Sequence, residues 1–242
     1  MEIQLANPDL RAVRGTNLDL GVAWQGPGGL HLALSGFAKR LARYLNDTGN
    51  DLNNPDAVMQ YRAVRLIRPE NGGTATILGL EASAAVPLGG VARVLRHVAL
   101  AGDLTMLHSA VRLNNPALDR VERTQYAPAS NLLLRLHYDD GRISADAACR
   151  LTGAYIQEYG IEVPTFAGTT PLSGSALDTW VRPSRQIDLA VARQWGTHTL
   201  RLALRNALND TAYRATIGRT SDAVPQTILG GRQVLLTWTA GF

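Results

Sequence analysis

The sequence predicts an all-β fold: a segment of an antiparallel transmembrane β-barrel with about nine long strands, short periplasmic turns and long outer loops. Three observations predict this fold. Apolar and polar residues alternate with a period of two along most of the 242 residues. Short turns and long loops follow one another in strict alternation. The alternating runs are about ten residues or longer, the length that a tilted strand needs to cross the hydrocarbon.

Composition narrows the class of protein further. The chain is 45% hydrophobic and 18% charged, so it has the apolar content of a folded protein and too little charge for a disordered one. Every apolar stretch is interrupted well before about 18 residues, which excludes a membrane-spanning helix. Lys39 is the single lysine among 24 basic residues, and the arginines are spread along the chain. The net charge of +4 therefore does not predict a nucleic-acid partner.

The first half of the chain contains four alternating runs. Residues 16–24 place Leu18, Leu20, Val22 and Trp24 on one face, and the turn 26–29 follows. The second run spans 30–45 and ends at an Asn/Asp-rich loop at 46–56. The third spans 58–88, with a bulge expected at 70–73 and a turn at 88–90. The fourth spans 91–113 and precedes a loop that ends near residue 126.

The second half contains five more runs. Residues 132–138 and 143–155 form a hairpin around the two-residue turn Asp140-Gly141. A Gly/Thr/Pro/Ser-rich loop spans 157–180. Residues 187–192 and 200–205 form a second hairpin around the turn 196–197, and a polar loop runs to about Gly231. The last strand places Val234, Leu236, Trp238, Ala240 and Phe242 on one face.

No constellation of residues predicts catalysis, a metal site or a cofactor. The five histidines are scattered, and Cys149 has no second cysteine as a partner. Asp47, Asp51 and Asp56 do not have the spacing of a calcium loop. We therefore expect no enzyme activity.

Four stretches of sequence, in order, carry a resemblance to a known family. They are Asn7-Pro8-Asp9-Leu10 followed by Thr16-Asn17-Leu18-Asp19-Leu20-Gly21, then 71–81 (NGGTATILGLE), then 204–213 (LRNALNDTAY), and finally 231–242, which ends in an aromatic residue. These stretches resemble the C-terminal part of the β-barrel of TonB-dependent outer-membrane receptors. One mild departure is Ala207, where the family usually has Leu.

The resemblance implies that residues 1–242 form the C-terminal portion of such a barrel, without its plug domain and N-terminal strands. About nine strands cannot close with antiparallel pairing throughout, and receptors of this family have about 22 strands and a plugged lumen. We therefore expect this chain to be inactive alone. Its expected partners are outer-membrane lipid, the barrel-assembly machinery (which would recognise Trp238 and Phe242), the upstream plug and strands, and the TonB system through the missing N-terminal part.

The resemblance also implies energy-coupled uptake of a scarce ligand, such as a ferric siderophore, across the outer membrane of a Gram-negative bacterium, provided that an upstream signal peptide exists. Polar residues opposite the apolar face are candidates to face the lumen: Arg135, His137, Asp146, Arg150, Asp188, Arg201 and Arg205. The arginines could hold an anionic metal chelate or plug carboxylates, or the lumen could simply be wet and charged. Ligand selection is expected in the outer loops 46–57, 114–127, 157–180 and 209–230.

Two alternatives remain open from the sequence. One is a small, self-contained outer-membrane pore or enzyme, which would need an even number of strands and, for an enzyme, a convergent catalytic set. The other is a soluble β-sandwich binding module, in which a second sheet would bury the apolar face.

Overall fold

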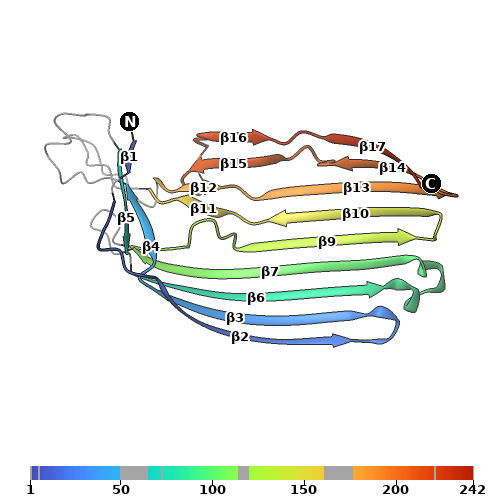
Figure 1. Ribbon diagram of the computed structural model, residues 1–242, viewed down its shortest axis with the longest axis horizontal. Coiled ribbons are helices and arrows are strands. Elements are labelled where there is room, and N and C mark those ends of the chain that lie inside the picture. The colour runs from blue at the N-terminus through green and yellow to red at the C-terminus, as the bar shows by residue number, and fades with distance from the viewer. Residues whose placement is uncertain are drawn as a thin grey trace.

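The chain forms one long curved sheet with two small sheets at one end (Figure 1). The computed structural model describes residues 2–4, 6–49, 65–71, 73–113, 120–160, 177–220 and 222–241. Nine long strands of the main sheet pair in the order β17-β14-β13-β10-β9-β7-β6-β3-β2, and the short β8 pairs with β7. All these pairings are antiparallel. The predicted count of about nine long strands is confirmed.

The strands of the main sheet have the following bounds. They are β2 (Arg14–Gln25), β3 (His31–Ala42), β6 (Thr74–Pro87), β7 (Val98–Leu113), β8 (Arg120–Glu122), β9 (Ser130–Asp139), β10 (Ile143–Thr152), β13 (Ser184–Trp195), β14 (His198–Arg205) and β17 (Gln233–Ala240). β14 and β17 have 8 residues each, fewer than the ten or so expected of a membrane-crossing strand, although β14 is two residues longer than the alternating run 200–205. They are shorter because both strands leave the main sheet at irregular segments, 206–210 and 230–232.

The four turns lie together at one end of the sheet, and the chain reaches its C-terminus at that end (Figure 1). Three of them are short, as predicted. The first contains the 3-10 helix η1 (Pro27–Gly29), the third joins β9 to β10, and the fourth is Gly196-Thr197, flanked by the pair Trp195 and His198. In the third turn, Asp140 N donates to Ile143 O (3.2 Å), so the two central residues are Gly141 and Arg142, one position later than predicted.

The second turn is longer than predicted. Residues 88–97 contain two 3-10 helices, η2 (Leu88–Gly90) and η3 (Arg93–Leu95), and the strand begins at Val98 instead of residue 91. Val91 and Val94 are highly exposed there, although they belong to an apolar run in the sequence. None of the helices among the described residues reaches the length and apolar character that a membrane span needs.

At the loop end, segments predicted as loops form strands instead. The first small sheet has the order β1-β5-β4, with β1 (Glu2–Gln4), β4 (Leu45–Gly49) and β5 (Arg65–Asn71). The predicted loop at 46–56 is therefore wrong for residues 46–49, and its remainder lies outside the described residues. The expected bulge at 70–73 is a change of sheet between β5 and β6, because β5 pairs with β1 and β4 while β6 pairs with β3 and β7.

The second small sheet extends the main sheet beyond a break. Its strands are β11 (Tyr155–Glu158), β12 (Thr179–Val181), β15 (Thr211–Ile217) and β16 (Gln226–Leu229), in the order β11-β12-β15-β16. That order repeats β10-β13-β14-β17, to which these strands are joined along the chain. The predicted loops at 157–180 and 209–230 are therefore wrong where these four strands form. The predicted loop at 114–127 is wrong at β8. Outside the described residues lie 114–119 and 161–176 of these loops.

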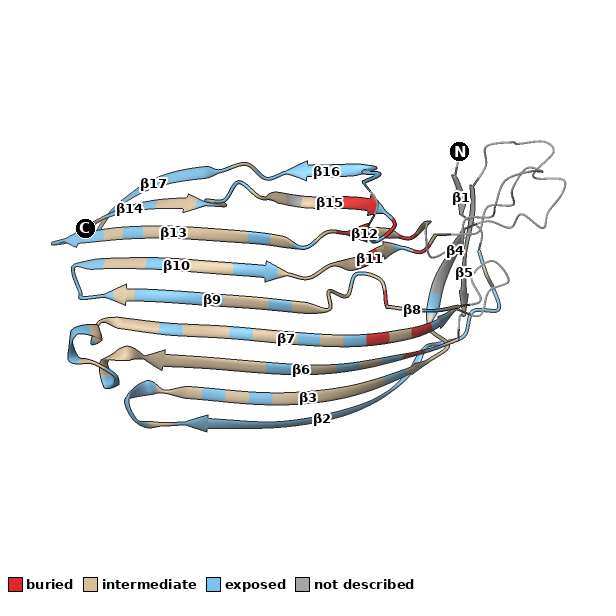
Figure 2. Cartoon of the chain, turned by 180° about the vertical axis from the view of Figure 1, so that it is seen from behind, coloured by how far each residue is buried: buried red, intermediate tan, exposed pale blue. Residues whose placement is uncertain are grey.

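Buried residues gather at the loop end, and the rest of the main sheet is a mixture of intermediate and exposed residues (Figure 2). One cluster contains Ala75, Val111, Ile156, Tyr159 and Trp180, which join the ends of β6 and β7 to β11 and β12. By contrast, Leu20 is 79% exposed and Val234 70%. No second sheet covers this apolar face among the described residues, which argues against a soluble sandwich.

Candidate functional site

The strand register places the predicted polar side chains on one face of the main sheet. His137 pairs with Asp146, and Arg135 pairs with Ala148, which pairs with Asp188 on the next strand. Residues directly opposite each other across antiparallel strands point to the same face, and positions two apart on one strand share it. By this rule Arg150, Arg201 and Arg205 lie on that face too. We call it the inner face, and we call the opposite, leucine-rich face the outer face.

One ion pair and one histidine–carboxylate hydrogen bond occupy the inner face of β7, β9 and β10. Arg135 Nη2 lies 3.7 Å from Asp103 Oδ2, and His137 Nδ1 lies 2.7 Å from Asp146 Oδ1. All four side chains are about half exposed. Such exposed contacts contribute little to stability, but Asp103 compensates the charge of Arg135, and His137 is engaged by Asp146. Arg135 and His137 are therefore less available to an anionic ligand than the sequence suggested.

Asp188 is held by its own neighbours. Its carboxylate accepts hydrogen bonds from Gln186 Nε2 (3.0 and 3.1 Å) and from the backbone N of Asn206 (2.9 Å). These bonds fix the position where β14 ends. Asp188 thus supports the local structure of the wall.

Three arginines of the predicted set have no ion-pair partner among the residues that the structure describes. They are Arg150 on β10 and Arg201 and Arg205 on β14. Arg205 borders a polar hollow of about 280 Å³ at the loop end of β13, β14 and β17, which Ser184, Gln186 and Gln233 also line. A guanidinium in such a place can donate paired hydrogen bonds to a carboxylate, a phenolate or a phosphate.

Charge on the inner face is divided between its two halves. The acidic residues Asp19, Glu81 and Asp103 lie on β2, β6 and β7, where Lys39 on β3 is the basic counterpart. The unpaired arginines all lie in the other half, on β10 and β14, and outnumber the inner-face carboxylates there, which are Asp146 on β10 and Asp188 on β13. An anionic group that enters the lumen is therefore attracted towards β10 and β14.

A partly buried ion pair ties the loop-end segments together, and no pattern in the sequence indicated it. Arg120 on β8 donates to the carboxylate of Asp178, whose Oδ1 also accepts from the backbone N of Gly160 (2.7 Å). Glu122 lies 3.4 Å from Arg120 Nε, without the alignment of a hydrogen bond. Burial raises the pKa of Asp178 to about 6, even though Gly160 and Arg120 act in the opposite direction. The two residues are 58 positions apart in predicted loops, so only the fold brings them together.

Tyr159 reinforces the same region. Its hydroxyl donates to the carbonyl of Arg123 (2.7 Å), and burial raises the pKa of this phenol, so it stays protonated. The nearby Thr124 donates from its backbone N (3.0 Å) and its hydroxyl (2.9 Å) to Ser109 Oγ. These bonds fix the segment between β8 and β9 against β7 and β11.

Two of the sequence stretches that carried the family resemblance contain an asparagine whose side chain hydrogen-bonds to other segments. We call each such set of hydrogen bonds a staple. Asn71 Oδ1 accepts from the backbone N of Arg11 (2.7 Å), and Asn71 Nδ2 donates to the carbonyls of Arg11 (2.8 Å) and Arg43 (3.2 Å). A Cβ atom on Gly79 would lie 2.1 Å from the Phe37 ring, so glycine leaves room for that ring on the inner face.

A second staple lies at 206–210. Asn206 Nδ2 donates to the carbonyls of Asp210 (2.9 Å) and Gly231 (3.0 Å), and Asn206 Oδ1 accepts from Asp210 N (3.0 Å). Asp210 in turn accepts from the backbone N of Arg185 (2.6 Å) and of Thr211 (3.0 Å). The side chains of Asn206 and Asp210 therefore hold β13, β14 and β17 together at the break.

The predicted assembly signal is only partly described. Trp238 lies on the outer face at the turn end, where its ring stacks on His198 (5.8 Å between centroids), which also contacts Trp195 (6.3 Å). Phe242 lies outside the described residues. Among the described residues there is no group of three His, Cys, Asp or Glu side chains that could hold a metal ion.

Comparisons with known proteins agree on the architecture. A family model described as "TonB dependent receptor-like, beta-barrel" matches residues 2–208. No curated protein sequence matches the chain. The chain is similar to a crystal structure of a variant of the ferric enterobactin receptor PfeA from Pseudomonas aeruginosa in complex with enterobactin (TM-score 0.63, 16% identity, 99% of this chain and 33% of that chain).

Two further solved structures show the same likeness. They are the unliganded ferric citrate transporter FecA (TM-score 0.62, 14% identity, 92% of this chain and 30% of that chain) and the iron transporter FrpB from Neisseria meningitidis (TM-score 0.61, 14% identity, 98% and 32%). At such identities the likeness shows the fold. The chain spans about a third of the length of the solved structures that it resembles.

Proposed function

Because the chain belongs to the TonB-dependent receptor-like β-barrel family, we propose that it forms the C-terminal wall of an outer-membrane receptor for energy-coupled uptake of an anionic metal chelate. The similar structures include a ferric enterobactin receptor and a ferric citrate transporter, which supports a ferric chelate as the ligand class. Uptake of this kind needs binding and gating, and we assign the chain no chemical reaction.

The observation that carries the proposal is the group of unpaired arginines on the inner face. Arg150, Arg201 and Arg205 present three positive charges in a half of the wall whose inner-face carboxylates, Asp146 and Asp188, already accept hydrogen bonds from neighbouring residues. A ferric chelate with carboxylate or catecholate groups carries negative charge that guanidinium groups can bind by charge-assisted hydrogen bonds. Carboxylates of a plug domain are the second class of group that these arginines could hold.

The wall needs further strands before it can work. Among the described residues, β2 and β17 each pair on one side only within the main sheet. An open strand edge is not tolerated in the hydrocarbon, and an odd number of strands cannot close with antiparallel pairing throughout. We therefore infer that strands and a plug from the rest of the receptor complete the barrel, and that residues 1–242 alone do not transport.

The test uses the complete receptor that contains this chain, in cells supplied with radiolabelled ferric citrate or ferric enterobactin. Replacing Arg150, Arg201 and Arg205 together by Gln should weaken binding by at least about tenfold, because each charge-assisted hydrogen bond contributes more than 1 kcal/mol. Arg142→Gln, in the turn at the opposite end, is the matched control and should bind normally.

Folding of each variant is checked by heat-modifiable migration on gels. Normal binding and uptake of both chelates by a folded triple variant would contradict the role of these arginines. Normal binding with impaired uptake would instead indicate contact with the plug.

A further inference from the structure

Small residues on two neighbouring strands leave a hollow of about 430 Å³ on the outer face. Ala82 and Ala84 lie on β6, and Gly102 on β7 pairs directly with Ala84. Along the same strands, the next outer-face pairs on either side have larger side chains. These pairs are Leu80 with Met106 and Val86 with Leu100. The hollow is therefore a local feature of the sequence and does not run along the whole face.

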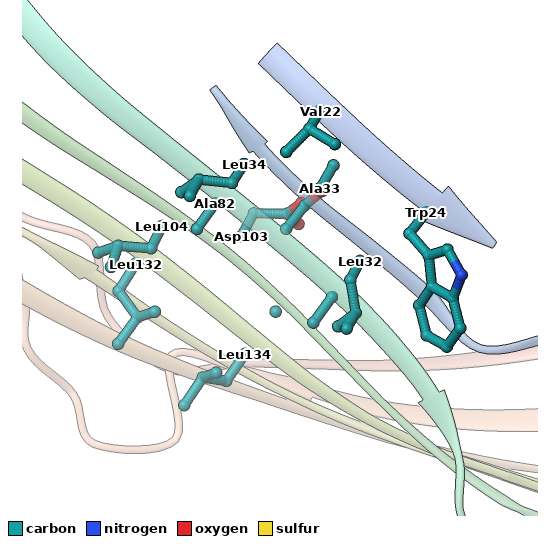
Figure 3. A pocket seen from close by; sticks show the side chains of 13 residues that line it. Val22, Trp24, Leu32, Ala33, Leu34, Ala82, Asp103, Leu104, Leu132 and Leu134 are labelled. Carbon is teal, nitrogen blue, oxygen red and sulfur yellow. The ribbon is translucent and has the colours of Figure 1, made fainter. Parts of the chain in front are cut away.

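Bulky apolar side chains form its walls. Leu34 on β3 pairs with Ala82, while Leu134 on β9 pairs with Gly102. Figure 3 shows Leu34, Leu132 and Leu134 around the hollow, with the indole of Trp24 at one end. The floor is two strands wide at Ala84 and Gly102 and one strand wide at Ala82, whose partner on β7 is Leu104. Neighbouring strands lie about 5 Å apart, which is close to the width of one hydrocarbon chain.

The lining offers an occupant no charged group. Asp103 borders the hollow, but its carboxylate lies on the inner face, 3.7 Å from Arg135. The hollow is continuous with the exposed leucines of the outer face, which in this fold faces the hydrocarbon of the membrane. Its occupant must therefore be apolar, and the surrounding solvent is lipid.

Trp24 indicates where the hollow lies along the membrane normal. It lies one residue before the end of β2, next to the first turn, where indole side chains of membrane proteins sit at the interface. The hollow therefore opens towards the leaflet on the turn side, which in this family is the periplasmic side. We propose that it holds one acyl chain of a phospholipid from that leaflet in a fixed position.

Van der Waals packing, and not exclusion of water, would favour the bound acyl chain over other acyl chains of the bilayer. Lipid tails are as apolar as leucine, so the preference comes from the extra van der Waals contacts that a concave surface gives. We expect a modest enrichment, about threefold over a flat part of the outer face.

The experiment places the complete receptor in vesicles of phosphatidylethanolamine with a trace of the same lipid that carries a photoreactive diazirine in its acyl chain. After illumination, tryptic peptides are compared by mass spectrometry. Residues 97–112 contain Gly102 and Leu104 of the hollow, and residues 186–193 contain Leu189 and Val191 of the same face outside it. The first peptide has 16 residues and the second 8, so labelling is compared per residue, and the first should be labelled about threefold more than the second.

A filling variant sharpens the test. Ala84→Leu places a larger side chain over Gly102 and should bring the labelling of 97–112 down to that of 186–193. Ala147→Leu, an outer-face change on β10 away from the hollow, should leave the enrichment unchanged. Equal labelling of the two peptides per residue in the unmodified receptor would overturn the proposal, whether or not the variants fold. Low labelling of 97–112 together with a chemically cross-linked dimer would also overturn it, because a second receptor would then cover the hollow.

Discussion

Asn206 holds the break between β14 and β15, and replacing it by Ala should destabilise the barrel more than any comparable change nearby. Its side chain makes hydrogen bonds to the carbonyls of Asp210 and Gly231 and to the backbone N of Asp210. Its backbone is also left-handed, with φ of 52°. Both properties favour asparagine at this position.

The expected loss follows from these contacts. Three hydrogen bonds at about 1 kcal/mol each give about 3 kcal/mol, and alanine in the left-handed region adds about 1 kcal/mol. Asn209 is a matched control, since its φ is 55° but the structure gives its side chain no hydrogen bond among the described residues. Asn209→Ala should therefore cost only about 1 kcal/mol.

The assay is urea unfolding of the complete receptor in detergent, followed by the loss of heat-modifiable migration. Asn206→Gly separates the two causes, because glycine tolerates the backbone angle but makes none of the three bonds. It should still lose about 3 kcal/mol. If Asn206→Gly behaves like the unmodified protein, or if Asn206→Ala and Asn209→Ala are equal, then the side chain of Asn206 is not a staple and the reasoning fails.

Three other predictions follow from particular contacts. Gly153→Ala should cost about 1 to 3 kcal/mol in the same assay, because its Cβ would lie 2.9 to 3.2 Å from Ser130, whereas Gly90→Ala, with open space around it, should be neutral. The folded state binds the Asp178 proton more tightly than an unfolded chain does, since its pKa is raised to about 6, so stability should fall as pH rises from about 4 to 6. Asp178→Asn should flatten that pH profile, and an unchanged or steeper slope would contradict the assignment. His137→Ala should change stability by less than about 1 kcal/mol, because its pair with Asp146 is half exposed; a larger loss would show that the lumen is drier than we infer.

The long strands could be predicted because each of them has an apolar outer face and a more polar inner face, which gives the sequence a period of two. Leu134 and Leu136 alternate with Arg135 and His137, and the register confirms that these leucines share the outer face. The turn at Gly196 was equally clear, since a glycine with φ of 57° closes a two-residue hairpin.

The loop-end strands were missed for a physical reason. β12 has only 3 residues, and its partners β11 and β15 are joined to other long strands of the wall. Such short strands are stabilised by neighbours far along the chain, so their own sequence has no visible period. The opposite error occurred at Val91 and Val94, which were predicted to lie in a strand. They lie in the long turn, but their apolar side chains resemble those of a strand in the sequence.

The alternation of residues along each strand was enough to predict which residues lie on the inner face. It could not predict which of them are free to bind a ligand. Alternation placed Arg135 and Arg201 on one face, whereas only the fold shows that Asp103 compensates Arg135 and that nothing described compensates Arg201. Likewise, the pairing of Arg120 with Asp178 depends on contacts across 58 residues. A sequence period determines which face a side chain occupies, and the packing of distant segments determines its partner.

The central claim is that the main sheet separates lipid on its outer face from the aqueous lumen on its inner face. Cysteine substitution along β14, in a Cys149→Ser background of the complete receptor, tests it most directly. A water-soluble maleimide should label cysteines at 201, 203 and 205, and a lipid-soluble one should label those at 200, 202 and 204. Uniform labelling along the strand, or labelling with the opposite parity, would contradict the account.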